Sequence, residues 1–392
     1  MVSYQLAPEQ QDLRDSVAQF AREVVAPVIA GHYERGEFPY DIVARMGKLG
    51  LFGLPFPEEY GGMGGDYFAL CLALEELARV DSSVAITLEA AVSLGAMPIY
   101  RYGTEAQRRR WLPELCAGER LAAFGLTEPG GGSDIPGAMR TTARLEPGTE
   151  LTGAEWVVDG TKAFITNAGT AVTSLVTVLA ITGRDEAGRK EISSIVVPAG
   201  TAGFVPGPEY SKVGWCASDT RELSFSGCRV PEENLLGQRG RGYAQFLETL
   251  DAGRVAIAAL ATGLAQGCVD ECVRYAGQRE AFGRPLQAHQ AIQFAIADMD
   301  ARAHTARLAW YDAAARLVAG LSIKKEAAIA KLTSSNAAMD NARAATQVFG
   351  GYGFMNESPV GRFYRDAKVL EIGEGTSEVQ RILIARELGL SG

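Results

Sequence analysis

The segment that decides the fold runs from Phe246 to Cys272 and reads FLETLDAGRVAIAALATGLAQGCVDEC. Positions 246, 250, 253, 257, 260, 264, 268 and 272 recur at steps of three or four, and seven of these eight residues are apolar. This spacing predicts one long helix with a continuous buried face. The eighth residue, Gly253, weakens the helix and leaves space on that face. A close crossing with another helix and a gap that faces a ligand explain this glycine about equally well.

Further helices follow this segment towards the C-terminus. The sequence Gly-Arg-Pro at 283–285 ends the first helix, and the helical pattern resumes at about 287–319 and again at about 323–349. Long helices that lie side by side predict a C-terminal four-helix bundle over residues 232–392.

The last helix follows the sequence Glu-Gly-Thr-Ser-Glu at 374–378. Ser377 and Gln380 have the spacing of a capping box, which predicts that the helix begins at Ser377. Glu374 then lies in the preceding loop, beside the flexible Gly375. A carboxylate at this place can be aimed at a ligand, and burial in an apolar cleft would raise its pKa toward the neutral range of a general base. Acidic residues also occur at helix starts simply because they complement the helix dipole.

Two other parts precede the bundle. Residues 1–120 are predicted to be helical and begin with an amphipathic segment over 6–30. Over residues 121–231 the pattern changes to short β-rich runs, and two of these runs around Asp159-Gly160 predict a β-hairpin. The expected fold class is therefore α+β, with an N-terminal α-helical domain, a central β domain and the C-terminal bundle.

Composition limits the classes of function. The 392 residues carry a net charge of -9, which argues against nucleic acid as a partner. The six cysteines contain no C-x-x-C pair and only three histidines are present, so we expect no metal site and reduced thiols. We find no run of 18 apolar residues and no signal peptide, so no membrane partner is expected. Arginine far outnumbers lysine, which favours a bacterial protein. Reduced thiols and the lack of a signal peptide favour the cytoplasm.

Six short motifs occur in one order along the chain. The first, Thr-Glu-Pro-Gly-Gly-Gly-Ser-Asp at 127–134, is a glycine-rich loop whose backbone N–H groups can approach a ligand closely. It lacks the Lys-Ser/Thr of a Walker loop. The others are Lys-Ala-Phe-Ile-Thr-Asn at 162–167, Arg-Glu-Ala-Phe-Gly at 279–283, His-Gln at 289–290, Gln-Val-Phe-Gly-Gly at 347–351 and Glu-Gly-Thr-Ser-Glu at 374–378. With these motifs the chain resembles the acyl-CoA dehydrogenase family over essentially its full length.

The resemblance implies a flavoenzyme with FAD bound between the β domain and the C-terminal helices. The residues that match the family's cofactor contacts in the same subunit are Phe124, Leu126, Thr127, Gly132, Ser133, Phe164, Ile165, Thr166, Thr376 and Glu378. The residues that match contacts to the FAD of a neighbouring subunit are Arg279, Phe282, Gln290, Gln347, Gly350 and Gly351. Sharing of the cofactor in this way implies a homotetramer, arranged as a dimer of dimers.

The resemblance also implies the reaction. Glu374 would remove the α-proton of an acyl-CoA while the β-hydrogen leaves as hydride to flavin N5, which gives a trans-2-enoyl-CoA. Electrons would then pass to an electron-transfer flavoprotein. The positions that match substrate contacts are Ser133, Asp251, Arg254, Gly375 and Arg386. Arg254 could equally serve as a buried structural partner of Asp251.

Several positions bear on the substrate and the base. Some relatives carry the base where this chain has Gly253, which supports the later glutamate as the base. Gly373 stands where many members have tyrosine, and Phe164 stands where tryptophan is often found. The segment 82–89 lacks the arginine that glutaryl-CoA-type members need, which disfavours a dicarboxylic substrate. Its Glu89 is expected to face solvent rather than the far end of the acyl pocket, because charged residues are rarely buried without a partner.

Other functions are left open by the sequence. An acyl-CoA oxidase would share the chemistry but pass its electrons to oxygen, and the compact length argues against it. A dehydrogenase that acts on an acyl carrier protein would share the motifs. A flavin- or acyl-binding protein without turnover is disfavoured by the intact base and flavin motifs. The overall pattern is nearest to the short-chain and short-branched-chain members of the family.

Overall fold

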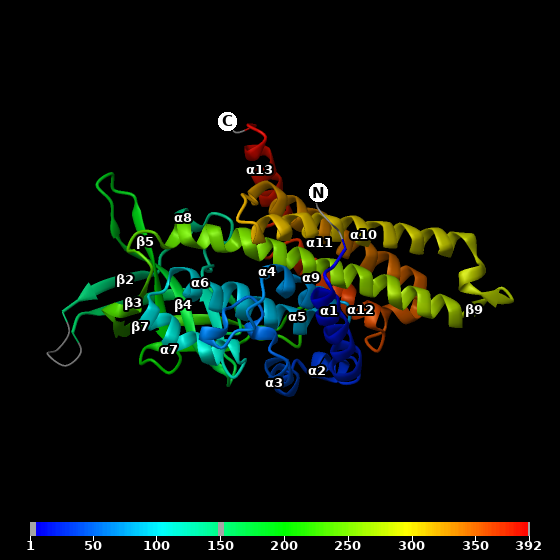
Figure 1. Ribbon diagram of the computed structural model, residues 1–392, viewed down its shortest axis with the longest axis horizontal. Helices are drawn as coiled ribbons and strands as arrows, with labels where there is room; N and C mark the ends of the chain where they lie inside the picture. Colours follow the sequence, from blue (N-terminus) through cyan, green and yellow to red (C-terminus); the bar gives the residue numbers. More distant parts are fainter. Residues whose placement is uncertain (1–4, 148–152, 391–392) are drawn as a thin grey trace.

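The computed structural model describes residues 5–147 and 153–390. Its parts follow one another in the predicted order, with helices first, then a β-sheet and then a second group of helices. Figure 1 shows the sheet at one end of an elongated molecule, from which the longest helix, α9 (Gly242–Gln278), runs to the opposite end. The predicted α+β fold class, with its three parts, is confirmed.

The N-terminal part is a group of short helices around one apolar core. The amphipathic segment predicted over 6–30 is helical but interrupted. Helix α1 ends at Phe20, a π-helical turn follows over Ala21–Val25, and α2 begins at Ile29. The buried face continues through the break, so apolar periodicity alone does not reveal it. The helices are α1 (Pro8–Phe20), α2 (Ile29–Arg35), α3 (Tyr40–Lys48), α4 (Tyr67–Ala78), α5 (Ser82–Glu89), α6 (Met97–Tyr102) and α7 (Glu105–Cys116).

Helix α5 lies at the centre of this core. Asp81 caps it by accepting hydrogen bonds from Ser83 N at 2.9 Å and Val84 N at 3.2 Å, and every residue of the helix is buried. Two helical stretches, Ser82–Tyr102 and Gly242–Gln278, have the length and hydropathy to cross a membrane, but 94% of each apolar window is buried inside the structure. Internal packing therefore accounts for their apolar character.

The central part is a mixed sheet with the strand order β6-β7-β3-β2-β4-β5-β8, and β1 pairs with β4 in parallel. Its inner faces hold a second apolar core that includes Trp156, Val178 and Phe225. The strands are β1 (Leu121–Gly125), β2 (Thr142–Glu146), β3 (Glu155–Thr166), β4 (Thr173–Arg184), β5 (Lys190–Pro198), β6 (Phe204–Glu209), β7 (Thr220–Pro231) and β8 (Leu235–Leu236).

The hairpin predicted around Asp159-Gly160 is wrong, because β3 is one continuous strand. Its pairing with β7 shifts register between Val158 and Gly160, which marks a bulge rather than a turn. Gly160 has a φ of +146°, and a Cβ atom added there would lie 2.5 Å from Thr141 Oγ1. The glycine therefore allows two strands to approach closely. An Asp-Gly pair occurs both in hairpin turns and at such close approaches, so the pair alone does not tell which of the two is present.

The C-terminal part is a bundle of long helices, as predicted. Helix α9 packs against α4, α10 and α11. The short α12 was not predicted. The remaining helices are α10 (Gln290–Val318), α11 (Lys324–Phe349), α12 (Pro359–Leu370) and α13 (Ser377–Glu387), and a two-stranded turn of β9 (Glu280–Ala281) and β10 (Arg284–Pro285) joins α9 to α10.

Two glycines of α9 allow it to cross α4 closely. A Cβ atom added at Gly263 would lie 2.1 Å from Glu75 O, and one at Gly267 would lie 2.3 Å from Arg79 O. Any larger residue at either position would force the two helices apart.

A buried carboxylate joins the three parts of the molecule. Asp366 on α12 accepts hydrogen bonds from Tyr33 Oη at 2.5 Å, from Ser82 Oγ at 2.7 Å and from Trp215 N at 2.7 Å. Tyr33 belongs to α2, Ser82 to α5 and Trp215 to the β6–β7 connection, so donors from the N-terminal and central parts meet one acceptor from the bundle. Burial raises the pKa of Asp366 to about 6, against these donors.

Candidate active site

Glu374 lies in the turn between α12 and α13, as predicted. The turn is sharp because both Glu374 (φ +51°) and Gly375 (φ +93°) adopt left-handed backbone conformations. A glutamate rarely adopts this conformation, so surrounding contacts must hold it. Such strained residues cluster at functional sites, which supports a functional role for this one.

Helix α13 begins at Ser377 as predicted, but its cap is Thr376. Thr376 Oγ1 accepts a hydrogen bond from Val379 N at 3.3 Å. Gln380 does not complete a capping box, because its Nε2 donates to Gly375 O at 2.9 Å. The side chain of Gln380 therefore supports the turn that carries Glu374.

A buried lysine fastens the same turn to the bundle. Lys331 on α11 is fully buried, and its Nζ donates to Gly375 O at 2.9 Å. Burial lowers the pKa of Lys331 to about 8, although the nearby Glu374 opposes this change. Lys331 lies in none of the six motifs and was not predicted. The available signal was that Lys331 falls in phase with the buried alanines of α11.

The carboxylate of Glu374 occupies the space that Gly253 leaves on α9. A Cβ atom added at Gly253 would lie 2.5 Å from Glu374 Oε2. Of the two explanations left open for this glycine, the structure therefore supports the gap in the buried face, which holds the Glu374 carboxylate. The close helix crossing is made elsewhere on the same helix, at Gly263 and Gly267.

Burial gives Glu374 the protonation behaviour of a general base. The residue is partly exposed as a whole, but its Oε2 atom is buried and accepts no hydrogen bond of normal geometry from the described residues. Burial raises the pKa of Glu374 to about 7, against the opposing effects of Lys331, of the neighbouring Glu89 carboxyl group and of Arg254. A pKa near the working pH lets a carboxylate both take up and release a proton.

Glu89 was expected to face solvent, and this prediction is wrong. The residue ends α5 and is fully buried, and neither carboxyl oxygen accepts a hydrogen bond of normal geometry within the described part of the chain. Burial and the nearby charge of Glu374 raise the pKa of Glu89 well above its usual range. The prediction rested on the rule that charged residues are rarely buried without a partner. This rule does not cover a neutral carboxyl group, which can be buried.

Asp251 and Arg254 form an ion pair on the first half of α9. Arg254 is buried, and its Nη1 contacts Asp251 while its Nε donates to no described residue. The structural pairing left open by the sequence is therefore present, and the Nε–H is still available to a ligand. Arg386 and Glu378 lie on exposed positions of α13, where Glu378 pairs with Arg381 at 3.4 Å.

The glycine-rich loop after β1 is fastened to β3 by a buried ion pair. Lys162 Nζ lies 2.8 Å from Glu128 Oε1 and donates to Leu126 O at 3.1 Å. Glu128 also accepts hydrogen bonds from Arg140 N at 2.6 Å and Thr141 N at 3.0 Å. Burial opposes ionisation of Glu128, but Lys162 and these donors hold its pKa below the usual value. This ion pair was not predicted, although Glu128 and Lys162 lie in the motifs at 127–134 and 162–167.

This fastening brings the two predicted cofactor segments of the β domain together. Ala163 N donates to Thr127 O at 2.8 Å, so the loop lies beside residues 164–166. A Cβ atom added at Gly130 would meet no atom within 4 Å, and one at Gly132 would meet only a methyl group of Thr127 at 3.9 Å. Internal packing does not require these glycines, and their open backbone fits a ligand that lies against the loop.

The side chains of these segments differ in exposure. Phe164 is 65% exposed, has a φ of +61°, and its ring lies 5.3 Å from that of Tyr210. An exposed aromatic ring held in this way can pack against a flat ligand such as a flavin ring. Ile165 belongs to the buried β core, and Phe124 stacks on Phe246 of α9 at 5.1 Å. Leu126, Thr127 and Thr166 are half-buried, whereas Gly132 and Ser133 are exposed.

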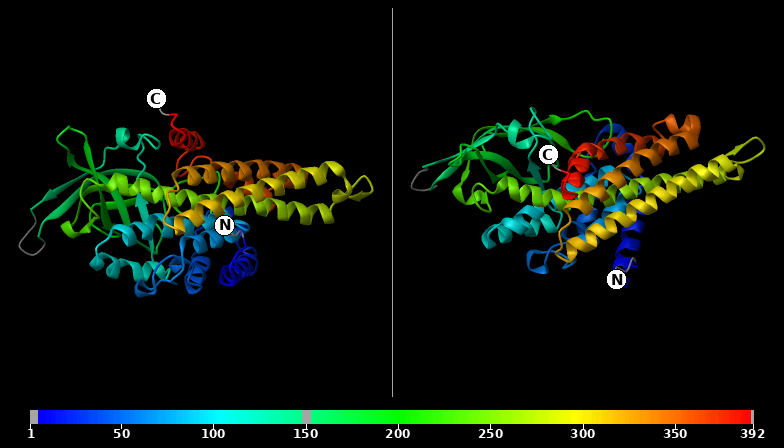
Figure 2. Two further views of the ribbon diagram at one scale, coloured as in Figure 1. Left: turned by 45° about the horizontal axis from the view of Figure 1, so that its top comes forward. Right: turned by 90° about the horizontal axis from the view of Figure 1, so that it is seen from above.

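The other predicted cofactor residues gather at the opposite end of the molecule. Arg279 and the 97% exposed Phe282 lie at the turn around β9, and Gln290 begins α10 beside it. The rings of Tyr275 and Phe349 stack at 4.0 Å and bring residues 347–351 to the same end. Two views in Figure 2 confirm that this end lies away from the sheet.

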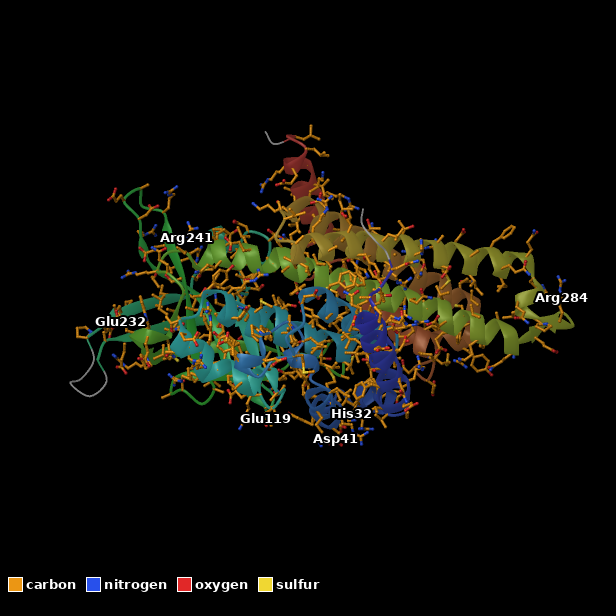
Figure 3. All side chains as sticks on the ribbon, viewed as in Figure 1. His32, Asp41, Glu119, Glu232, Arg241 and Arg284 are labelled. Atoms are coloured by element: carbon orange, nitrogen blue, oxygen red, sulfur yellow. The ribbon has the colours of Figure 1, made fainter. Side chains whose placement is uncertain are left out.

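One chain cannot bring both groups of residues to a single cofactor. Phe246, which contacts the sheet, and Arg279 are separated by most of α9, about 50 Å at 1.5 Å per residue. Figure 3 shows Glu232 near the sheet and Arg284 at the far turn, at opposite ends of the molecule.

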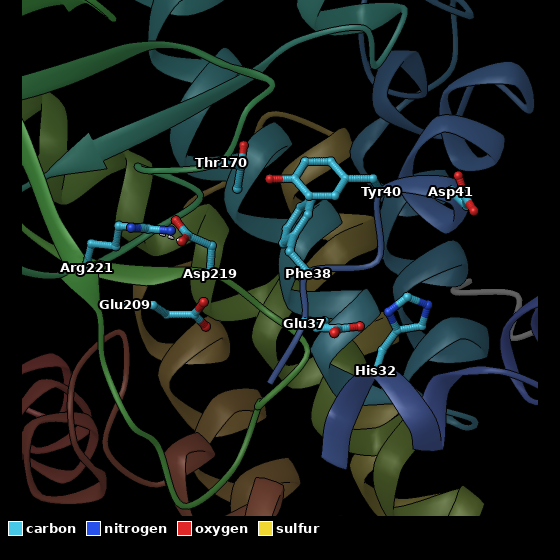
Figure 4. A pocket seen from close by; sticks show the side chains of 9 residues that line it. All are labelled: His32, Glu37, Phe38, Tyr40, Asp41, Thr170, Glu209, Asp219 and Arg221. Atoms are coloured by element: carbon cyan, nitrogen blue, oxygen red, sulfur yellow. Dashed lines mark hydrogen bonds and ion pairs between the residues drawn. The ribbon is translucent and has the colours of Figure 1, made fainter. Parts of the chain in front are cut away.

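A separate pocket of about 490 Å³ opens between α2, α3 and the sheet (Figure 4). It includes none of the predicted site residues, and its wall carries an ion pair of Arg221 Nε with Asp219 Oδ1 at 2.6 Å. Its charged lining does not suit an acyl chain. The lining residues are His32, Glu37, Phe38, Tyr40, Asp41, Thr170, Glu209, Asp219 and Arg221.

Known proteins match this chain along its whole length. The N-terminal, middle and C-terminal domain models of acyl-CoA dehydrogenase match residues 7–119, 123–228 and 240–389. A probable acyl-CoA dehydrogenase of Bacillus subtilis is 45% identical over 387 residues, which are 99% of this chain and 100% of the relative.

Two solved structures have nearly the same fold. Butyryl-CoA dehydrogenase from Megasphaera elsdenii has a TM-score of 0.93 and 39% identity, over 99% of this chain and 100% of the other. A chain in the structure described as the electron transferring flavoprotein of Acidaminococcus fermentans has a TM-score of 0.93 and 40% identity, over 99% of both chains.

Fold, site and relatives together define the class of this protein as an FAD-dependent oxidoreductase. The chain belongs to the acyl-CoA dehydrogenase family, whose members are FAD flavoproteins. The resemblance recognised in the sequence, the class of enzyme and the cofactor are thereby confirmed.

Proposed function

We propose that this protein removes the α-proton and the β-hydride of a short saturated acyl-CoA and releases the trans-2-enoyl-CoA. The observation that carries the proposal is the buried Oε2 atom of Glu374, which lies in the gap left by Gly253 without a donor among the described residues. Bound FAD supplies the acceptor for the hydride. The protein supplies the base, the orientation of the substrate and the exclusion of water.

Glu374 is the base in this proposal. A thioester α-hydrogen is only weakly acidic, so its removal requires hydrogen-bond donors at the carbonyl oxygen, where negative charge develops. The backbone N–H of Glu374 is proposed as one such donor, because this residue holds a left-handed backbone conformation of the kind found at functional sites. Lys331 keeps the turn in place through its hydrogen bond to Gly375 O. Arg254 Nε and Ser133 are proposed to contact the substrate, together with Asp251, Gly375 and Arg386.

The cofactor-binding residues are proposed to act from two subunits. Residues of the glycine-rich loop and residues 164–166 would hold FAD within one subunit, together with Thr376 and Glu378. The group of Arg279, Phe282, Gln290, Gln347, Gly350 and Gly351 would reach the FAD of a neighbour. The distance of about 50 Å along α9 and the exposed aromatic Phe282 support this arrangement, since a neighbour would cover that surface. A homotetramer, a dimer of dimers, is the expected assembly.

The proposed substrate is a short acyl group without a second carboxylate. The similar enzyme from Megasphaera elsdenii is a butyryl-CoA dehydrogenase. At Gly373 a Cβ atom would meet only Val369 O at 3.5 Å, so the residue before the base leaves room for substituents on the acyl chain. The segment 82–89 carries no arginine that could pair with a second carboxylate, which disfavours a dicarboxylic substrate.

The proposed electron acceptor is an electron-transfer flavoprotein, and the proposed location is the bacterial cytoplasm. The acceptor is supported by the structural neighbour from Acidaminococcus fermentans, which is described with such a flavoprotein. An acyl-CoA oxidase would instead react rapidly with oxygen after reduction.

Anaerobic titration of the purified protein with acyl-CoAs tests the proposal. Butyryl-CoA and short branched acyl-CoAs are expected to bleach the flavin absorbance, whereas glutaryl-CoA is not. Glu374→Gln keeps the size of the side chain but removes the base, so it should bind FAD and fail to bleach. Unchanged bleaching by this variant would sink the assignment of the base. A yellow protein that only an acyl carrier protein thioester bleaches would replace CoA by that carrier.

A further inference from the structure

Two buried carboxyl groups, those of Glu89 and Glu374, interact in this site, and the proposed function uses only one of them. Glu89 at the end of α5 is 0% exposed, and Glu374 Oε2 is also buried. No described donor reaches either oxygen of Glu89 or Glu374 Oε2 with normal geometry. An ionised carboxylate carries no hydrogen to donate, so two facing carboxylates leave each other unsatisfied.

One shared proton resolves this conflict. Two negative charges side by side in an apolar interior repel each other, and each also loses its hydration. A single proton removes one charge and creates one hydrogen bond between the carboxyl groups. The remaining question is which of the two residues holds the proton.

The groups around the pair favour a proton on Glu89. The cations that act on the pair, Lys331 from α11 and Arg254 from α9, act on Glu374 and stabilise its ionised form. The titratable groups that act on Glu89 from α4 are Tyr67 and Cys71, and burial keeps both neutral by raising the pKa of each. Ser93, from the π-helical turn Ala90–Ala96, is the other polar neighbour of Glu89.

We propose that Glu89 is a positioning residue that stays protonated and donates a hydrogen bond to the Glu374 carboxylate, which keeps the base ionised and fixed in direction. This inference rests on the proposed role of Glu374 as the base. When Glu374 takes the substrate proton, the C–H bond breaks, an O–H bond forms on Glu374, and Glu89 keeps its own proton. Glu89 therefore takes part in no bond change, and acts only by stabilising the charged form of its neighbour.

Two substitutions separate the donor from the shape of the side chain. Glu89→Gln retains the size and an N–H donor, whereas Glu89→Leu retains the approximate size and removes the donor. Without the donor, the ionised form of Glu374 is less stable, so the acid limb of kcat/KM should move to higher pH, by about one unit in the leucine variant. The glutamine variant should stay close to wild type. An acid limb that is unmoved or lowered in Glu89→Leu would overturn the proposal, as would a glutamine variant that behaves like leucine.

Glu76→Gln provides the matched control. Glu76 is also a buried glutamate of the N-terminal helices, but it pairs with Arg79 at 3.5 Å and belongs to no proposed site. This variant should leave the acid limb in place. Failure of the proposed function would look different, because Glu374→Gln would then still reduce the flavin.

Infrared spectroscopy gives a second readout that needs neither turnover nor the leucine variant. At pH 8 the wild-type protein should show the C=O stretch of a protonated buried carboxyl group, which disappears in Glu89→Gln and persists in Glu76→Gln. A wild-type spectrum without the band that depends on Glu89 would overturn the proposal even if Glu89→Leu does not fold.

Discussion

Replacing Gly253 by alanine tests the central geometric claim about the site. The added Cβ atom would lie 2.5 Å from Glu374 Oε2, and real Cβ atoms essentially never approach another atom within 3.0 Å. The carboxylate must therefore retreat by about half an ångström or more. A displacement of about 1 Å at a reacting group can cost about 100-fold in rate, so half of it corresponds to about tenfold, or about 1.4 kcal/mol of activation free energy.

The same substitution should not destabilise the fold. The only close contact is the end of a flexible side chain, and alanine is favoured over glycine inside a helix by about 0.5–1 kcal/mol. We therefore expect flavin reduction by butyryl-CoA to slow by about tenfold or more while the thermal unfolding temperature stays equal or rises. Anaerobic stopped-flow absorbance measures the first quantity, and differential scanning fluorimetry measures the second.

A glycine of the same helix supplies the control. A Cβ atom added at Gly277 would meet only Gln287 Oε1 at 3.5 Å, an ordinary contact. Gly277→Ala should thus share the gain in helix stability without the loss of rate. If Gly253→Ala reduces the flavin as fast as wild type, the Glu374 carboxylate does not occupy this gap during the reaction.

Three further predictions concern stability. Gly263→Ala places a Cβ atom 2.1 Å from the backbone oxygen of Glu75 and should lower the free energy of unfolding by about 1–3 kcal/mol in urea titrations; an unaltered value would contradict the close crossing. Lys162→Met leaves Glu128 buried without its partner and should cost about 3–5 kcal/mol, most of it recovered when Glu128→Gln is added. The pKa of Glu374 rises from 4.5 to about 7 on folding, so the native state holds more protons in this window, and stability should fall by about 3 kcal/mol as pH rises through it. Glu374→Gln should abolish this part of the slope, and equal slopes in both proteins would refute the assignment.

The sequence predicted the order of the three parts because their apolar periods differ and each period extends over many residues. The long α9, the following α10 and α11, and the start of α13 at Ser377 were all indicated by periodicity and helix-breaking residues. Local patterns with two structural uses were less informative. Asp159-Gly160 suits both a turn and a bulge, so the sequence alone could not place Gly160 inside β3.

The position of Glu374 in the turn before α13 was predicted because a motif contains this residue, whereas buried residues outside a recognised role were missed. Glu374 was found through the pattern around it. Glu89, Lys331 and the Glu128–Lys162 pair depend on contacts between segments far apart in the chain, which no local pattern records. For Glu89 the general preference of charged residues for solvent gave the wrong answer, because a functional site can hold such a residue as a neutral acid.

The carboxylate of Asp366 gives the molecule a property that its three-part sequence does not suggest. Its donors come from α2, α5 and the β6–β7 connection. Separating any one part therefore removes hydrogen bonds from the Asp366 carboxylate or from its donors. Unfolding of one part therefore removes support from the remaining two. The chain should melt in a single cooperative transition, and a protease cut between its parts should not release a fragment that folds by itself.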